Sequence, residues 1–507
     1  MALILALVIA IGSIVWGTVA AARGRKMNLQ EWSVGSRKFG TWLFWFLMVG
    51  ETFTTFALLG ASQSVFSNGA PGYYVLGTMV LTAAVGYWVV PRIWRAGKLH
   101  GLVTMGDYFT TRFGAPWFGG LIAVFGIVSL LLYAQVQLTG LSLILQSLFG
   151  NSLPSLAYVI AGGVLVAAFV LVGGMRSAAF TAVVKDVLLI AVLLVIAVGA
   201  ASAAGVSGPM GVFDALKETQ PHAATLPGIK GTAATNSWWW MSFLLITPLG
   251  SFALPHMFQV SYTAKDVTTI RRNQVIQPLY SLFYVLIVLI ALAAVLALPN
   301  LPDKQANASL LIFVHDNFPS WVIGLLGGAG ILVALVPTAV LILTASSLFS
   351  RNVVGGVSKK LAGSLTLSRA GVVVFTAIVV LLVANSTSKL LSIMTNVYSA
   401  VGQLAPALFL SMLWRRVTAA GLAAGAVCGG LIVGVPQLSG FFAHTVPPGT
   451  VIGLPALVVN LVVTVVVSLL TRPPATAAID VGTGDSAPVE ALGTLEEVPG
   501  EEAALPR

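Results

Sequence analysis

The stretch FLMVGETFTT, residues 46–55, places a glycine, a carboxylate and three threonines inside one long apolar run. The run covers residues 41–66. An α-helix of that length, rising about 1.5 Å per residue, can cross a hydrocarbon layer about 30 Å thick. Polar residues at the middle of such a run predict a membrane helix that is interrupted near the centre of the bilayer. This stretch therefore points to a bundle of membrane helices with a functional break.

A second apolar run is interrupted in the same way, at TPLGSFALPHMFQ, residues 247–259. Each proline removes a backbone hydrogen bond and clashes with the preceding turn, so this helix is predicted to be broken or kinked. The two interrupted runs lie five spans apart, which is the pattern of inverted five-helix repeats. Carbonyl and amide groups freed at such breaks are ready ligands for ions and carboxylates.

The composition also indicates a membrane protein. Of the 507 residues, 57% are hydrophobic and 8% are charged, whereas a soluble domain has about 25% charged residues. We therefore predict an all-α polytopic membrane protein with about thirteen transmembrane helices. The expected spans are residues 2–21, 41–66, 71–94, 117–149, 154–174, 177–204, 237–262, 278–299, 321–350, 367–385, 389–414, 418–437 and 448–471.

The basic residues predict the orientation of these spans, because lysine and arginine concentrate in cytoplasmic loops. The loops expected outside hold only Lys217, Lys230, Lys304 and Lys389, and most of the 26 basic residues fall in loops expected inside. The N-terminus is thus expected outside the cytoplasmic membrane and the C-terminus inside. The same rule accounts for the net charge of +10, so we expect the lipid bilayer and a small solute as partners, with no nucleic acid and no obligate protein partner.

These patterns divide the chain into six parts. They are an extra N-terminal helix with a cytoplasmic loop (1–40), a first five-helix repeat (41–204), an extracellular loop (205–236), a second five-helix repeat (237–414), two extra C-terminal helices (415–471) and an acidic tail (472–507). The tail has too few apolar residues to fold, so we expect it to be disordered in the cytoplasm.

Ionisable residues inside the spans are candidate functional residues, because charge is expensive in lipid. Glu51 lies about ten residues into its span, or ~15 Å deep, where it could carry a proton or help to bind a cation. The alternative is a neutral carboxyl that neighbouring groups satisfy. Lys185 and Asp186 are adjacent and so ~100° apart around a helix. We expect them to face different directions and to pair with neighbouring helices, rather than Asp186 to serve ion exit. His256, beside a proline, is expected to be structural.

Gln135 and Gln137 are further buried polar residues, and we expect about half of such residues to line a substrate path. The sequence has no Walker glycine-lysine signature, no His-Glu-x-x-His and no Gly-x-Ser-x-Gly. These absences argue against a pump driven by ATP and against an enzyme. A gradient-driven carrier fits the pattern better.

Several short motifs, in order along residues 30–435, resemble the solute:sodium symporter family. They are WSVGSR (32–37), VTMGDYF (103–109), RFG (112–114), GGMRSA (173–178) and GQLAPA (402–407). The motifs LPHMF (254–258), RRN (271–273), PLY (278–280) and SLFSRN (347–352) are most similar to the bacterial monocarboxylate uptake permeases. The resemblance implies uptake of small organic acids such as lactate, pyruvate, propionate or acetate. It also implies a leucine-transporter-type 5+5 inverted-repeat core.

The resemblance also maps a sodium site onto this chain. In the family this site uses backbone carbonyls of the first core helix, here Gly50 and Phe53, and hydroxyls of the eighth. Alignment on the paired serines of that eighth helix puts Val333, Val336 and Pro337 at the usual ligand positions. Sodium needs oxygen ligands, and valine and proline have no side-chain oxygen. This departure argues against sodium coupling through the usual site.

Thr338 and Lys185 also bear on whether the usual sodium site is present in this chain. Thr338 is one position away and offers a single hydroxyl, and Lys185 stands where the family often has threonine. If sodium is not used, Glu51 is the natural alternative, because a carboxyl can bind a proton with the substrate and release both inside. A proton carried with a monocarboxylate anion is electroneutral.

The prediction is a symporter that imports short monocarboxylates by alternating access, with proton coupling preferred over sodium and no organic cofactor. We expect a helix N-terminal dipole to meet the substrate carboxylate. The expected substrate-binding residues are Thr52, Phe53, Thr54, Gln135, Gln137, Thr247 and Pro248. The expected ion-coupling residues are Glu51, Gly50, Phe53, Asp186 and Thr338. The alternatives are a sodium-coupled symporter of an amino acid, sugar or urea and, from another class, a transporter-like sensor.

Overall fold

The computed structural model describes residues 1–22, 29–150, 152–358 and 363–472, and none of these residues forms a strand. Nine described helices are long and apolar enough to cross a membrane, and eleven spans result if each of two bent helix pairs counts as one. Helix α8 (Ser155–Ala203) has 49 residues and is divided at Gly174, where φ is 59°. A straight helix of that length would measure about 74 Å, enough for two spans. If the two parts of α8 and the broken pair α3–α4 are counted as spans too, the described helices reach the predicted number of about thirteen.

The first repeat, predicted at residues 41–204, contains one broken helix followed by long helices. Its elements are α3 (Thr41–Gly50), the π-helical turn η2 (Phe56–Gly60), α4 (Ala61–Asn68), η3 (Ala70–Tyr73), α5 (Tyr74–His100), α6 (Met105–Phe113), α7 (Pro116–Phe149) and α8. Helix α6 begins with a capping box, in which the Thr104 side chain accepts from the Asp107 amide at 3.0 Å.

The second repeat, predicted at residues 237–414, also starts with a broken helix. Its elements are α10 (Ser237–Ser251), α11 (Pro255–Ser261), α12 (Val267–Ile276), η6 (Gln277–Tyr280), α13 (Ser281–Ala297), η7 (Asp303–Ala308), α14 (Ser309–Asn317), α15 (Ser320–Leu348), η8 (Phe349–Val353), α16 (Val354–Val357), α17 (Leu365–Ala384), α18 (Leu390–Val401), η9 (Gly402–Leu404) and α19 (Ala405–Leu413).

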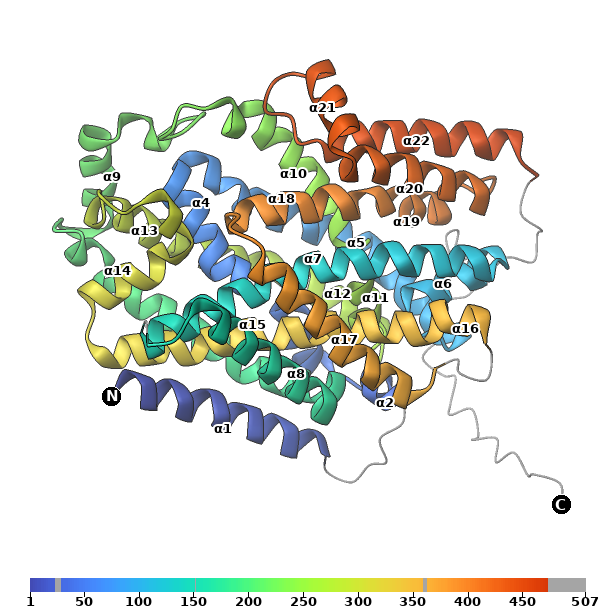
Figure 1. Ribbon diagram of the computed structural model, residues 1–507, viewed down its shortest axis with the longest axis horizontal. Helices are drawn as coiled ribbons and strands as arrows, with labels where there is room; N and C mark the ends of the chain where they lie inside the picture. Colours follow the sequence, from blue (N-terminus) through green and yellow to red (C-terminus); the bar gives the residue numbers. More distant parts are fainter. Residues whose placement is uncertain (23–28, 151, 359–362, 473–507) are drawn as a thin grey trace.

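The remaining helices lie before, between and after the repeats. They are α1 (Ala2–Ala22), α2 (Leu29–Val34), η1 (Gly35–Arg37), α9 (Gly208–Thr219), η4 (Pro221–Ala224), η5 (Ala233–Thr235), α20 (Ala419–Gly434), α21 (Pro436–Thr445) and α22 (Gly453–Leu470). Helix α9 occupies the predicted extracellular loop, and α21 is bent by 91° from α20. The start of α1 and the end of α22 lie at opposite ends of the molecule, as expected for an odd number of spans (Figure 1). The predicted disordered tail falls on 473–507, outside the described residues.

Helix α15 is the centre of the bundle, because 94% of its most apolar window is buried. It packs against α8, α7 and α1, and α1 lies along the lower edge of the view beside it (Figure 1). A Cβ added at Gly324 would lie 2.7 Å from the Ala2 carbonyl oxygen, and one at Gly328 would lie 2.9 Å from Ile9 Cβ. These two small residues, four apart, let α1 approach α15 closely.

Candidate functional site

Both predicted helix breaks are present. Helix α3 ends at Gly50 and the regular turns resume at η2, while α10 and α11 meet at a bend of 48°. At the first break, side chains replace the backbone ladder: the Thr55 amide donates to Gln137 Oε1 at 3.1 Å, and the Phe56 amide donates to Thr54 Oγ1 at 3.2 Å. The break is therefore held open by specific polar partners.

A cavity of about 50 Å³ lies where the two breaks meet. The first break contributes Glu51, Thr52, Thr54 and Phe56 to the lining. The second break contributes Thr247, Ser251, Leu254, His256 and Met257. The other lining residues are Tyr74, Val75, Thr78, Met79, Thr82, Tyr133, Tyr284, Met394 and Tyr398. The two repeats thus bring four of the predicted site residues together at this cavity. They are Glu51, Thr52, Thr54 and Thr247.

The cavity is lined by polar atoms for which the described part of the chain supplies no hydrogen-bond partner. Both carboxyl oxygens of Glu51, Thr247 Oγ1, His256 Nδ1 and the Tyr74 hydroxyl have no hydrogen-bond partner among the described residues. Glu51 Oε2 lies 3.7 Å from His256 Nε2, which is too long for a hydrogen bond. Buried polar groups are normally paired, so an unpaired set around one cavity indicates a ligand site.

Five other predicted residues lie away from the cavity lining. Gln137 supports the first break through Thr55, whereas the Gln135 amide donates to the Leu382 carbonyl at 3.3 Å. The Phe53 ring is buried against Tyr284, with ring centroids 4.7 Å apart. Pro248 is buried within α10, and the Thr338 hydroxyl donates to the carbonyl of Ala334, one turn earlier in α15, at 2.5 Å.

Lys185 and Asp186 correct one expectation. The two residues were expected to face different directions, but Lys185 Nζ lies 2.6 Å from Asp186 Oδ1, and both side chains are fully buried. The four-carbon stem of lysine allows the ammonium to reach around the helix, so the angle between Cβ directions does not decide the contact. The same ammonium donates to the carbonyls of Gly50 at 3.2 Å and Phe53 at 2.9 Å.

The sequence profile of the Sodium:solute symporter family matches residues 32–432. The chain belongs to the sodium:solute symporter family. The uncharacterized symporter YhjB of Bacillus subtilis (strain 168) is 33% identical over 473 residues, which cover 91% of this chain and 96% of that relative. The membership makes the chain a transporter rather than an enzyme, a multi-pass protein of a bacterial membrane.

Two further comparisons concern substrate and fold. A protein of Rhizobium johnstonii (strain DSM 114642 / LMG 32736 / 3841), named monocarboxylate transport permease protein, is 27% identical over 339 residues, or 66% of this chain and 67% of that protein. The structure of a Na+-coupled sialic acid symporter, in a substrate-bound outward-open state, superposes with a TM-score of 0.73 at 13% identity. It covers 93% of this chain and 99% of its own. At that identity the likeness shows the shared fold alone, a leucine-transporter-type fold.

The family is named for sodium, but the positions to which the resemblance maps the sodium ligands lack the expected donors in this chain. Val333, Val336 and Pro337 are buried in α15 and carry no side-chain oxygen. The Thr338 hydroxyl is used within its own helix, and the two carbonyls of the first break already accept hydrogen bonds from an ammonium. At the positions to which the resemblance maps the sodium ligands, the described residues thus offer no free side-chain oxygen, and the two carbonyls accept from Lys185.

Sequence reasoning did not single out several residues that surround the cavity. Tyr284 donates its hydroxyl to the Thr52 carbonyl at 3.3 Å and so holds the unwound segment in place. Thr78 and Thr82 face the cavity from α5. Their spacing of four residues, which puts two hydroxyls on one face of an apolar helix, is a signal that could have found them. Tyr284 follows Tyr280 at the same spacing of four residues, but the sequence does not show that its hydroxyl reaches the first break.

Charged links join elements near both ends of the molecule. Toward the expected outer side, Asp303 Oδ1 accepts from Lys230 Nζ at 2.5 Å and from Lys389 Nζ at 2.8 Å. The hydrogen bond from Lys230, reinforced by Lys389, holds the pKa of Asp303 below its usual range. At the opposite side, Asp107 of α6 accepts from Arg351 Nε of η8 at 2.6 Å. The second link ties the first repeat to the second.

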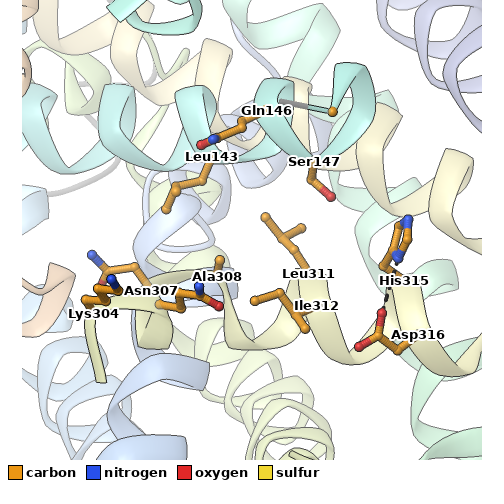
Figure 2. A pocket seen from close by; sticks show the side chains of 12 residues that line it. Leu143, Gln146, Ser147, Lys304, Asn307, Ala308, Leu311, Ile312, His315 and Asp316 are labelled. Carbon is orange, nitrogen blue, oxygen red and sulfur yellow. Dashed lines mark hydrogen bonds and ion pairs between the residues drawn. The ribbon is translucent and has the colours of Figure 1, made fainter. Parts of the chain in front are cut away.

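A larger cavity, of about 500 Å³, lies between the end of α7 and the segment η7–α14. Leu143 and Gln146 line it from one side, and Leu311, Ile312 and His315 line it from the other (Figure 2). It contains none of the predicted site residues and neither of the helix breaks. Because its groups come from the ends of helices beside outer loops, it is not the site formed by the two repeats.

Gly50 provides a stability prediction for the site. A Cβ at this position would lie 3.2 Å from Lys185 Nζ and 3.4 Å from Lys185 Cε, and the ammonium cannot withdraw without losing its contacts. We expect Gly50→Ala to lower the free energy of unfolding by about 1–3 kcal/mol, as overpacking does. Thermal unfolding in detergent measures the change. Gly12→Ala, where no atom lies within 4 Å of the new Cβ, is the matched control. Equal melting temperatures for the two variants would contradict the prediction.

Proposed function

We propose that this chain is a symporter that imports short monocarboxylates, such as lactate, pyruvate, propionate or acetate, by alternating access, with proton coupling preferred over sodium. The observation that carries the proposal is the small cavity at the meeting point of the two helix breaks, with its unpartnered polar atoms. The name of the relative from Rhizobium johnstonii supports the substrate class. The family membership supports symport.

The size of the cavity favours a solute of a few atoms. Its volume of about 50 Å³ is far below the ~300–1,000 Å³ of pockets for drug-sized ligands and closer to the ~30 Å³ that one water occupies in the liquid. A two- or three-carbon acid suits such a space better than a sugar does. The hydroxyls of Thr247 and Tyr74 are available to donate hydrogen bonds to a carboxylate.

The charge of the lining favours a proton as the coupling ion. No lysine or arginine is among the described residues that line the cavity, and its ionisable groups besides tyrosine are Glu51 and His256. A substrate carboxylate beside an ionised Glu51 would be repelled strongly at low dielectric. A proton on Glu51 removes that repulsion, so binding of the anion and of the proton support each other. Release of both on the inner side completes an electroneutral cycle.

Uptake into proteoliposomes tests this function. Labelled pyruvate or lactate is supplied outside, and a pH gradient (acid outside) and an inward sodium gradient are imposed separately. We expect accumulation with the pH gradient alone, collapsed by a protonophore and absent from protein-free liposomes. Accumulation that requires sodium would refute proton coupling. Good uptake of an amino acid, sugar or urea with no uptake of any monocarboxylate would refute the substrate class.

A further inference from the structure

Lys185 occupies an unusual position for a lysine in a membrane protein. It lies on the part of α8 that follows Gly174, and its side chain is fully buried. Its ammonium is within 3.2 Å of three oxygens: the Gly50 carbonyl at 3.2 Å, the Phe53 carbonyl at 2.9 Å and Asp186 Oδ1 at 2.6 Å. An ammonium has three hydrogens and no acceptor, so these three oxygens match its full capacity. The site is built around a positive charge.

The two carbonyls belong to the break in the first broken helix. Beyond Gly50, the amides of Thr55 and Phe56 donate to side chains instead of to carbonyls four residues earlier, and the Thr52 carbonyl accepts from a tyrosine hydroxyl. Carbonyls at such breaks are oriented into the bundle rather than along a helix, and in transporters they are the groups that coordinate a coupling cation. In this chain the ammonium of Lys185 donates hydrogen bonds to two of these carbonyls, those of Gly50 and Phe53.

We propose that Lys185 is a tethered cation: its ammonium fills the position that an inorganic cation would take at this break, so that the chain binds no sodium there. The geometry matches such a role, because two carbonyl oxygens and one carboxylate oxygen surround one positive charge at 2.6–3.2 Å. The helix that faces this region in the family site, α15, supplies no further side-chain oxygen at Val336 or Pro337. Tethering removes the need for a free ion and keeps Asp186 neutralised throughout the cycle.

A purely structural ion pair makes a different prediction from a tethered cation. If Lys185 only neutralised Asp186, its removal would destabilise the protein irrespective of which salt was present. If it occupies a cation position, removal of the side chain opens a space that is still lined by two carbonyls and a carboxylate. Sodium, a hard cation that prefers oxygen ligands, should enter that space.

The experiment uses the purified full chain in detergent and sodium alone as the probe. Saturable ²²Na⁺ binding and the melting temperature in sodium chloride against choline chloride are measured for the wild type, Lys185→Ala and Lys185→Met. We expect no saturable binding and no sodium-dependent shift for the wild type. Lys185→Ala should melt lower in choline and recover saturably in sodium. Lys185→Met, which removes the charge but fills the space, should melt lower and not recover.

Saturable sodium binding by the wild type would overturn the proposal, even if neither variant folded. A folded Lys185→Ala protein that binds no sodium would also overturn it. Lys185→Thr, whose hydroxyl adds an oxygen ligand, is a second opened variant for the case in which Lys185→Ala does not fold. The inference deepens the proposed function by addressing its coupling ion. Since the assay contains no organic substrate, its failure leaves the monocarboxylate proposal intact, and failed uptake of monocarboxylates leaves the cation result intact.

Discussion

Glu51→Gln is expected to abolish accumulation of pyruvate or lactate driven by a pH gradient, while exchange of labelled for unlabelled substrate at equal pH persists. Glutamine keeps the shape of glutamate but cannot take up and release a proton. Glu51 is buried, lines the central cavity and has no hydrogen-bond partner among the described residues, so no other fixed role competes for its carboxyl. Exchange does not require net proton movement and therefore separates loss of coupling from loss of folding.

The expected loss of accumulation in Glu51→Gln follows from a stoichiometry of one proton per monocarboxylate anion. One pH unit is worth about 1.4 kcal/mol, so symport of one proton with one anion sustains an accumulation ratio of about tenfold across that gradient. The variant should reach a ratio of about one. Glu218→Gln, which removes an exposed carboxyl on α9 at the expected outer side, is the matched control and should accumulate normally. Tenfold accumulation by Glu51→Gln would show that another group carries the proton.

The fold could be predicted from the sequence because lipid imposes a simple rule: long apolar runs become helices, and polar interruptions become breaks. That rule located the two broken helices. Of the residues predicted to meet there, Thr52, Thr54 and Thr247 line one cavity together with Glu51, whereas Gly50, Phe53 and Pro248 do not line it. Two features of the sequence carry that prediction: the position of the polar residues near the middle of a span and the five-span separation of the two interrupted runs.

The contacts of individual side chains could not be predicted in the same way. The pairing of Lys185 with Asp186 depends on the reach and rotamer of a long flexible stem, which helical periodicity does not describe. Gln137 and Gln135 are equivalent in the sequence, yet one supports the first break and the other bonds to α17, because they lie on different faces of α7. Tyr284 reaches the first broken helix only because α13 packs against it.

For the motif VTMGDYF, residues 103–109, the structure gives a physical reason for residues that the sequence identified only by resemblance to the family. Thr104 and Asp107 form the capping box that starts α6, and the same carboxylate then binds η8. A sequence comparison alone treats these residues as a family signature. The structure shows that one carboxylate starts a helix and joins the two repeats, so its loss should have a large effect.

Asp107→Ala is expected to lower the free energy of unfolding by about 3 kcal/mol, since it removes several charge-assisted contacts at once. Asp107 Oδ2 accepts from Arg351 Nε at 2.6 Å and from the amides of Val103 at 3.0 Å and Thr104 at 3.2 Å. Its Oδ1 accepts from Asn352 Nδ2 at 2.9 Å. The carboxylate is mostly buried, with 11% of its side chain exposed, so water cannot replace these partners fully. Thermal and denaturant unfolding in detergent measure the loss.

A double-mutant cycle separates the link between repeats from the helix cap. Asp107→Asn retains a cap acceptor and a partner for Asn352 but loses the charge, so it should cost less than alanine. The cycle of Asp107→Ala with Arg351→Ala should give a coupling energy of about 1–2 kcal/mol. Asp316→Ala, which breaks the exposed pair with His315 near the larger cavity, is the control and should cost less than about 1 kcal/mol. A coupling energy near zero would mean that Asp107 acts through the cap alone and that the two repeats are held together by apolar packing on this side.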